Sequence, residues 1–307
     1  MPSDAIKPQL LKGFRDFLPS QMILRQRIMQ TLRDIFERHG FAPLDTPALE
    51  YLETLMGKYG EEERLLYQFA DQGGRAVGLR YDLTVPLARV VGLYQHQIIF
   101  PFKRYHIAPV WRAEKPQRGR YREFYQCDID IVGSASMLAD AEILSILTES
   151  MDALGFTEYR VLLYNRKLLA AMARHAGVPD DQQVSVFRAL DKLAKIGPEG
   201  VLTTMERYGV DPDAARRALD FATAARGDNA AVLTSLEARL ADDPAGLEGV
   251  RELREIVEYL ALLTPSAGRV HIDPTLARGL DYYTGPVFEV EVTEPKIGSI
   301  ADRKSVV

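Results

Sequence analysis

Cysteine is almost absent from this 307-residue chain, which contains only Cys127. A single cysteine excludes an internal disulfide framework and is typical of proteins from a reducing compartment. Histidine is also scarce, and the five histidines show no metal-ligand spacing with the cysteine or with one another. We therefore expect no metal site built from these side chains.

Long hydrophobic runs are missing as well, since no stretch of 18 apolar residues occurs. The first 18 residues contain prolines and aspartates and no continuous apolar block, which argues against a signal peptide or a membrane span. We expect a cytoplasmic protein with no membrane partner. With 47% hydrophobic and 26% charged residues the composition is ordinarily globular, and the length allows two domains.

Phosphate-binding glycine motifs are absent too: the sequence has neither a GxxxxGK loop nor a GxGxxG motif after a strand. It suggests no Ser/His/Asp or Cys/His catalytic arrangement. The formal net charge of -5 argues against a surface that binds nucleic acid throughout, but it allows a local basic site. A nucleotide would therefore have to be held by arginines on a sheet. A reaction that activates a substrate only by positioning it and stabilising its charge is compatible with the sequence.

Helical and strand-like patterns alternate along the chain. Residues 21–39 form an amphipathic helical pattern with Ile23, Ile28, Leu32, Ile35 and Phe36 roughly on one face, and Gly40 ends it. The other expected elements are short strands in 65–79 around a glycine-rich turn, a helix at 85–94, two antiparallel strands in 101–132 joined by a charged loop, a helix at 139–154, and strands at 159–164, 269–272 and 287–292.

Residues 167–264 differ in texture from both flanks, with fewer aromatics, more alanine, and helical patterns separated by GVP, GP and DDP breaks. A helical block between two strand-rich blocks predicts an α+β domain interrupted by an insertion. We therefore expect a core in two parts, 1–166 and 265–301, with the helical insertion at 167–264.

The loop between the two strands of 101–132 is rich in cations. It carries Arg112, Lys115, Arg118, Arg120 and Arg122, opposed only by Glu114. Such density suits a polyanion, either a triphosphate or the acceptor end of an RNA, and Phe124 follows as a stacking platform for a base. A solvated charged loop is the alternative.

Two aspartates and a segment near the end of the chain are further candidates for a binding site. Asp82 and Asp130 stand in apolar contexts where an unpaired carboxylate is costly, so each is either functional or part of a buried structural ion pair. The stretch Arg278–Gly285 combines a cation, an acid, two tyrosines and two glycines before a strand-like run. Its arginine suits a phosphate or carboxylate, and its tyrosines suit a small polar ring. Taken alone, the alternative is an ordinary connection between two strands.

Four segments, in this order, resemble the histidyl-tRNA synthetases, which are class II aminoacyl-tRNA synthetases. Residues 40–50, with Pro47, are similar to motif 1, whose proline lies at a dimer interface. Residues 80–86 (RYDLTVP) are similar to the amino-acid-binding turn, and residues 110–124 (VWRAEKPQRGRYREF) to motif 2. Residues 278–285 (RGLDYYTG) match the histidine-specific signature. The four segments extend over nearly the whole chain.

The resemblance implies a homodimer with an antiparallel sheet flanked by helices, and an inserted helical domain on the tRNA side. It implies that ATP, carried with Mg²⁺, activates L-histidine to histidyl-adenylate, which is then transferred to tRNA(His). Arg112 and Arg278 would be catalytic, holding the α-phosphate from two sides. Glu114 and Arg120 would also contact ATP, and Phe124 would stack on its adenine.

The resemblance also implies a set of histidine-binding residues. Asp82, Thr84 and Gln126 would bind the α-ammonium group, with Leu83 in the same turn and Arg112 and Arg278 near the carboxylate. Asp130 and Tyr283 would hold the two imidazole nitrogens, with Tyr282 lining the pocket. An acid and a phenol can read both edges of an imidazole, which apolar rivals cannot satisfy.

The end of the chain departs from the family pattern. The family continues past this point into a glycine-rich strand with the motif 3 arginine and then an anticodon-binding domain, whereas residues 302–307 read DRKSVV. The same hexapeptide arises by translation of a common sequencing adapter, so we interpret 302–307 as a non-native tail, the alternative being a genuine short C-terminus. Without the third arginine we expect weak or absent adenylation by the 307-residue chain.

Two other functions compete with the ligase. One is the non-catalytic regulatory subunit of ATP phosphoribosyltransferase, which has the same fold without an anticodon domain. The other is a pseudo-synthetase module that senses uncharged tRNA. The combination of Arg112, Arg120 and Arg278 with both tyrosines favours the enzyme, because a regulator does not need a complete ATP clamp.

Overall fold

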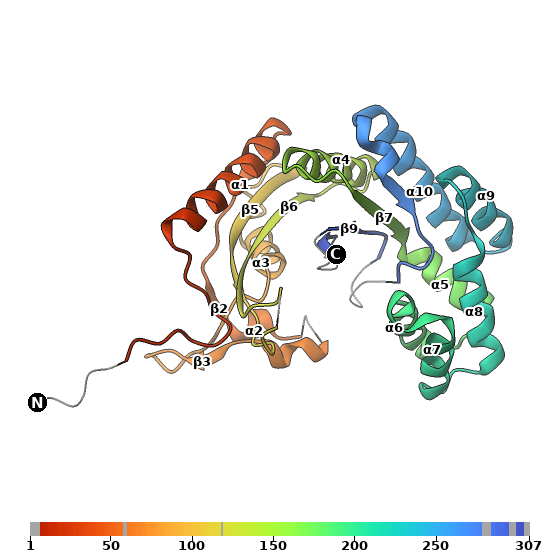
Figure 1. Ribbon diagram of the computed structural model, residues 1–307, viewed down its shortest axis with the longest axis horizontal. Helices are drawn as coiled ribbons and strands as arrows, with labels where there is room; N and C mark the ends of the chain where they lie inside the picture. The colour runs from red at the N-terminus through yellow and green to blue at the C-terminus, as the bar shows by residue number, and fades with distance from the viewer. Residues whose placement is uncertain (1–6, 58–59, 118, 278–283, 295–298, 304–307) are drawn as a thin grey trace, which may run out of the picture. The chain divides into compact units, whose positions relative to one another are not determined.

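The computed structural model describes residues 7–57, 60–117, 119–277, 284–294 and 299–303, and it divides into two units, unit 1 (Met1–Ser134) and unit 2 (Ala135–Val307). The elements of unit 1 are α1 (Pro19–Arg38), β1 (Ala42–Pro43), β2 (Leu49–Tyr51), α2 (Leu52–Leu55), η1 (Gly60–Leu65), β3 (Gln68–Ala70), β4 (Ala76–Leu79), α3 (Thr84–Tyr94), β5 (Phe102–Trp111) and β6 (Glu123–Val132) (Figure 1). Those of unit 2 are α4 (Met137–Ala153), β7 (Tyr159–Asn165), α5 (Arg166–His175), η2 (Asp180–Gln182), α6 (Gln183–Leu190), α7 (Leu193–Arg207), α8 (Pro212–Ala224), α9 (Asn229–Arg239), α10 (Pro244–Leu263), η3 (Pro265–Arg269), β8 (Val270–Ile272), β9 (Pro286–Val292) and β10 (Ser299–Asp302).

The long hairpin of β5 and β6 organises unit 1 (Figure 1). Its strands pair antiparallel from Phe102↔Val132 to Trp111↔Glu123, and β1 adds a short parallel pairing along β5. Strands β2, β4 and β3 form a second, antiparallel sheet. The Asp71 carboxylate closes the β3–β4 turn by accepting hydrogen bonds from the backbone N–H groups of Gly73 and Arg75. Both predicted hairpins are confirmed.

Helix α1 packs against the hairpin at its C-terminal end. There the Phe36 ring lies 5.8 Å from the Tyr105 ring, and Gly40, with φ of 76°, ends the segment in the left-handed conformation. Ile35 and Phe36 are buried, whereas Ile23 is 68% exposed. The predicted apolar stripe is therefore covered by this chain only at one end of the helix.

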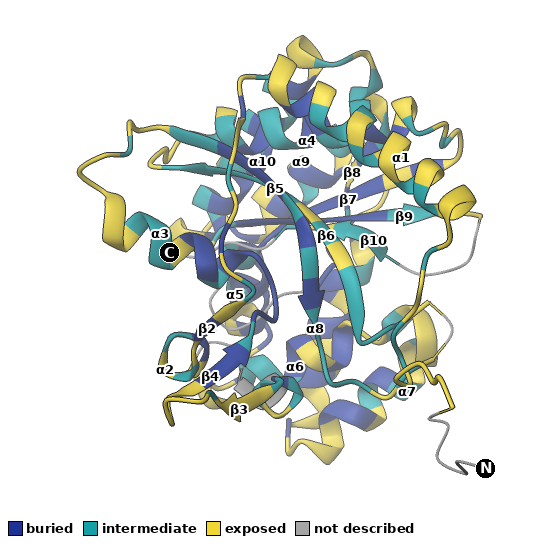
Figure 2. Ribbon diagram, turned by 90° about the vertical axis from the view of Figure 1, so that its left-hand side faces the viewer, coloured by how far each residue is buried: buried dark blue, intermediate teal, exposed yellow. Residues whose placement is uncertain are grey.

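A four-stranded sheet in the order β10-β9-β7-β8 forms the centre of unit 2. Six of the seven residues of β7 are buried, which is visible along most of its length in Figure 2. Its pairing with β9 is antiparallel and its pairing with β8 parallel. Helix α4 and helices α5 to α10 pack into one hydrophobic core with β7, β8 and β9. The predicted helical segment is helical, but it shares this core, so its boundaries at 167 and 264 stay a prediction.

The predicted breaks between these helices follow from local backbone chemistry. Gly197, with φ of 70°, lies in a kink where two helical stretches meet within α7. The side chain of Asp243 accepts a hydrogen bond from the backbone N–H of Gly246, and Pro244 occupies the first turn of α10, where a missing N–H is harmless. No helix in the described part of the chain is long and apolar enough to cross a membrane.

Helix α10 provides a matched test of the unit 2 core. The side chain of Leu260 is 1% exposed and that of Leu262 is 84% exposed on the same helix. We expect L260A to lower the free energy of unfolding by about 2–5 kcal/mol, because it leaves a cavity in the core. L262A should change it by less than about 0.5 kcal/mol. Urea unfolding followed by circular dichroism would measure both, and equal effects would contradict this packing.

Candidate functional site

One face of the β5–β6 hairpin carries several of the predicted site residues. Side chains alternate between the faces of a strand, so Phe124, Gln126 and Asp130 of β6 lie on the same face. In the observed register they stand opposite Val110, Ala108 and Arg104 of β5, respectively. We call this surface the even face, after its residue numbers.

The turn Asp82–Thr84 lies against the even face. Leu83 is fully buried and packs with Ala108 and Val110, and Phe124 lies against the same cluster. Asp82 is 2% exposed, and its Oδ1 accepts hydrogen bonds from the backbone N–H groups of Thr84 and Val85, both at 3.1 Å. This carboxylate therefore fixes the first turn of α3 next to the even face.

Arg112 follows the last residue of β5, and two aromatic rings orient its side chain. Its guanidinium carbon lies 4.2 Å from the ring centroid of Tyr81 and 5.1 Å from that of Phe124. Its Nε donates to the Tyr81 carbonyl oxygen at 3.3 Å. A half-buried guanidinium held in this way is a preorganised fork for a phosphate or a carboxylate.

The cations of the charged loop do not all have the same role. Arg120 and Glu114 form an ion pair at 3.5 Å, and the Arg120 side chain is 65% exposed. Arg122 is used in backbone contacts instead, since its side chain donates to the carbonyl oxygens of Glu114 and Lys12. Its backbone N–H also donates to Gly13, where a Cβ would lie only 2.8 Å from the Pro116 ring. The number of basic residues in the sequence therefore overstates the charge that this loop offers to a ligand.

Gln126 and Asp130 occupy the middle and far positions of the even face. The Gln126 side-chain oxygen Oε1 is buried and has no hydrogen-bond partner among the described residues. The Asp130 Oδ2 atom lies 2.6 Å from Nη2 of Arg104 in an ion pair. Arg104 is fully buried, whereas the Asp130 side chain is 22% exposed. The structural ion pair considered for Asp130 is therefore present, and its carboxylate still reaches the surface of the fold.

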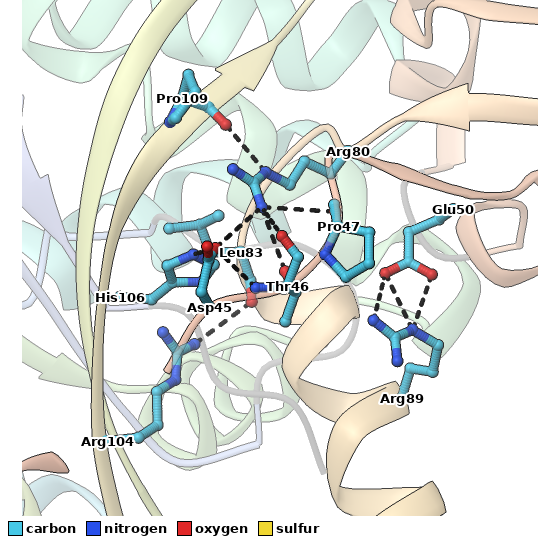
Figure 3. A network of polar contacts seen from close by, with 10 residues as sticks. All are labelled: Asp45, Thr46, Pro47, Glu50, Arg80, Leu83, Arg89, Arg104, His106 and Pro109. Carbon is cyan, nitrogen blue, oxygen red and sulfur yellow. Dashed lines mark hydrogen bonds and ion pairs between the residues drawn. The ribbon is translucent and has the colours of Figure 1, made fainter. Parts of the chain in front are cut away.

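Sequence reasoning missed a network of buried and partly buried charges near strand β5 and the segment before β2 (Figure 3). Arg80 donates to the carbonyl oxygens of Thr46 and Pro109, at 2.6 and 3.0 Å, so it joins the segment before β2 to β5. Glu50 and Arg89 form a two-pronged ion pair with a shortest distance of 2.7 Å. The signal in the sequence was weak, because these charges are distant from their partners along the chain.

His106 belongs to the same network (Figure 3). Its side chain is 3% exposed, and its Nε2 lies 3.0 Å from Asp45 Oδ1. Burial, reinforced by the nearby Arg104 guanidinium, lowers the pKa of His106 to about 4. The imidazole is therefore neutral near pH 7. The remaining site candidates, Arg278, Tyr282 and Tyr283, lie outside the described residues, as does Arg118 of the loop.

Comparison with known families assigns the chain. The family model of the histidyl-tRNA synthetases matches residues 13–296, nearly all of the described chain. The chain belongs to the histidyl-tRNA synthetase family. A curated histidine–tRNA ligase from Aeropyrum pernix is 48% identical over 298 residues, which are 96% of this chain and 67% of that protein. Further curated proteins with the same name are 40–46% identical.

Solved structures agree with this assignment. The histidyl-tRNA synthetase from Nostoc sp. PCC 7120 superimposes with a TM-score of 0.84 at 32% identity, over 94% of this chain and 66% of that one. A second solved structure, from Bacillus halodurans, is described as an ATP phosphoribosyltransferase regulatory subunit/histidyl-tRNA synthetase. It has a TM-score of 0.82 at 22% identity, over 95% of this chain and 74% of that one. At this identity the similarity shows the fold alone. The α+β, class II synthetase-like fold predicted from the sequence is confirmed. The chain spans about two thirds of the length of its curated relatives.

The low pKa of His106 predicts a pH dependence of stability. An unfolded histidine titrates near pH 6.5, so between about 6.5 and 4 the unfolded chain binds a proton here that the folded chain does not. The free energy of unfolding should therefore fall on acidification through this range, with a contribution from His106 on the order of 3 kcal/mol. Urea unfolding at pH 7, 5.5 and 4.5 should show a shallower pH slope for H106Q. H271Q, which changes an exposed histidine of β8, is the control, and parallel slopes for H106Q and the unmodified chain would contradict this assignment.

Proposed function

We propose that this chain binds L-histidine and ATP on the even face and takes part in histidine–tRNA ligation. The observation that carries the proposal is the order of side chains along β6: Phe124, then Gln126, then Asp130. Histidyl-adenylate has its groups in a matching order, with the adenine at one end, the α-ammonium group between, and the imidazole at the other end. The family assignment and the curated relatives favour the ligase over the regulatory subunit.

The amino-acid end of the ligand has three groups to satisfy. The buried Oε1 of Gln126 needs a donor, and an ammonium group supplies one in a charge-assisted hydrogen bond. Asp82 and Thr84, with Leu83 between them, border the same face and complete the ammonium site in this proposal. Asp130 would accept a hydrogen bond from one imidazole nitrogen, with Tyr283 serving the other and Tyr282 lining the pocket.

Arg112 would stabilise the charge that develops during activation. A histidine carboxylate oxygen attacks the α-phosphorus of ATP, a new P–O bond forms, and the bond to pyrophosphate breaks. Negative charge accumulates on the α-phosphate oxygens in this step, so arginines that already point at them lower the barrier without any protein base. Tyr81 and the even face hold Arg112 ready for this role, and Arg278 would press from the other side.

The remainder of the nucleotide would lie over the charged loop. Glu114 and Arg120 would contact ATP, which enters with its Mg²⁺ ion, and Phe124 would stack on the adenine. In the second step a hydroxyl of the terminal ribose of tRNA(His) attacks the activated carbonyl and AMP leaves. We further propose that the protein works in the cytoplasm as a homodimer, and the exposed Ile23 and Leu24 on α1 support burial of that helix by a second copy.

A calorimetric titration of the chain with L-histidine tests this function. We expect saturable binding of L-histidine and none of L-leucine, whose side chain cannot satisfy Asp130. Q126M should weaken L-histidine binding by roughly tenfold or more, because it removes the acceptor for the ammonium group. Q68M, a change at an exposed glutamine of β3, is the matched control and should leave the affinity unchanged.

Two results would contradict the proposal at different levels. No binding of L-histidine by the unmodified chain at millimolar concentrations would remove the histidine site altogether. Equal affinity of Q126M and the unmodified chain would leave the site in place and remove Gln126 from it.

A further inference from the structure

We propose that Arg104 is a positioning residue that determines how the histidine side chain is recognised. From its buried position it fixes Asp130 and the Asp82–Thr84 turn relative to each other, and it offsets the charge of Asp130, so that the site takes the neutral form of the imidazole. This inference rests on the proposed function above.

The geometry joins two parts of the proposed site through one nitrogen. Nη2 of Arg104 lies 2.6 Å from Oδ2 of Asp130 and also donates to the Leu83 carbonyl oxygen at 3.3 Å (the second contact is drawn in Figure 3). Asp130 would serve the imidazole, and Leu83 lies between the two turn residues proposed to serve the ammonium group. A single guanidinium therefore sets the separation between the two ends of the amino-acid site.

Arg104 is an unfavourable choice if its purpose is stability alone. It is fully buried, and its Nε and Nη1 atoms have no hydrogen-bond partner among the described residues. Burying a cation with unsatisfied donors is costly, and well-packed hydrophobic residues often replace buried ion pairs without loss of stability. A buried charge that is incompletely satisfied is better explained by a function that needs that charge at that point.

The charge of Arg104 also changes what Asp130 offers to a ligand. An arginine stays protonated at every pH at which the protein is folded, so it forms with the Asp130 carboxylate a pair of no net charge. Such a pair accepts a hydrogen bond from an imidazole N–H but attracts an imidazolium ion less than a lone carboxylate does. The site should therefore bind histidine best when its ring is neutral.

Other ionisable groups near this pair are shared by the unmodified protein and its variants. His106 and Asp128 are the next cross-strand pair on the even face, and Asp82 precedes α3. Asp45, in the segment before β2, lies close to His106 and to Arg80, which follows β4. Because the Arg104 guanidinium also lowers the pKa of His106, R104M is compared with the unmodified residue in an H106Q background as well, so that the pH dependence of binding reports on Arg104 itself.

The experiment is a titration of the full chain with L-histidine at pH 7.5 and pH 5.5, by calorimetry. For the unmodified chain we expect the Kd to rise roughly five- to tenfold at pH 5.5, where most free imidazole is protonated. R104M should raise the Kd at pH 7.5 by about tenfold or more, and its Kd should change less than about twofold between the two pH values. R104K keeps the charge without the fork, so it should bind a few-fold more weakly and keep the pH dependence.

Two further variants separate positioning from general destabilisation. R89M breaks the partly buried pair with Glu50 elsewhere in unit 1, and it should lower the melting temperature and leave the Kd and its pH dependence unchanged. In a double-mutant cycle, R104M should weaken binding much less in a D130N background than alone, because the two residues act together. If R104M does not fold, R104K gives the test: a Kd that is a few-fold weaker with the pH dependence kept is expected, and a Kd equal to that of the unmodified chain would overturn the role of Arg104.

The outcomes distinguish this inference from the function on which it rests. Binding of L-histidine that is unchanged in R104M, or that weakens with the same pH dependence as in the unmodified chain, would overturn the role of Arg104 and leave the proposed function intact. Absence of L-histidine binding in the unmodified chain would overturn both.

Discussion

The register of the β5–β6 hairpin is the constraint on which the candidate site depends. Ten consecutive cross-strand pairs place Phe124, Gln126 and Asp130 on one face, and a shift of one residue would turn all three to the opposite side. The opposite face is specified independently, because Tyr105 packs there on Phe36 and donates to Glu37 of α1. Helix packing on one side of the hairpin therefore decides which residues face a ligand on the other.

Buried arginines connect this hairpin to the short elements around it. Arg80 holds the segment before β2 by its carbonyl oxygens, and Arg104 holds the turn before α3. Neither contact adds much stability, since the cost of removing a guanidinium from water offsets most of the attraction. Their value lies in geometry, because a guanidinium that donates to a backbone carbonyl group holds the loop at a defined position against the hairpin. These contacts position the site residues at some expense of stability.

More of the fold than of the candidate site could be predicted from the sequence. Alternation of polar and apolar residues was enough for both hairpins, and the GP and DDP breaks marked Gly197 and Pro244 correctly, because these signals are local. The pairing of Arg104 with Asp130 depends on the register across a loop, and the role of Arg122 depends on the distant Gly13, so neither could be read from neighbouring residues. The stripe on α1 was visible, but no local pattern tells whether this chain or another covers it. Residues 278–283 of the signature at 278–285 lie outside the described residues, so the roles of Arg278, Tyr282 and Tyr283 stay predictions.

We propose that the adenine, the α-ammonium group and the imidazole of the bound adenylate lie in this order along the even face. A crystal structure of the chain with a non-hydrolysable histidyl-adenylate mimic, in which a sulfamoyl group replaces the phosphate, tests it most directly. We predict that the adenine lies at Phe124, the α-ammonium group at Gln126 Oε1, and the imidazole on the Asp130 carboxylate, with the contact between Arg104 and Asp130 unchanged. A ligand bound in the reverse direction, or on the opposite face of the hairpin, would contradict it.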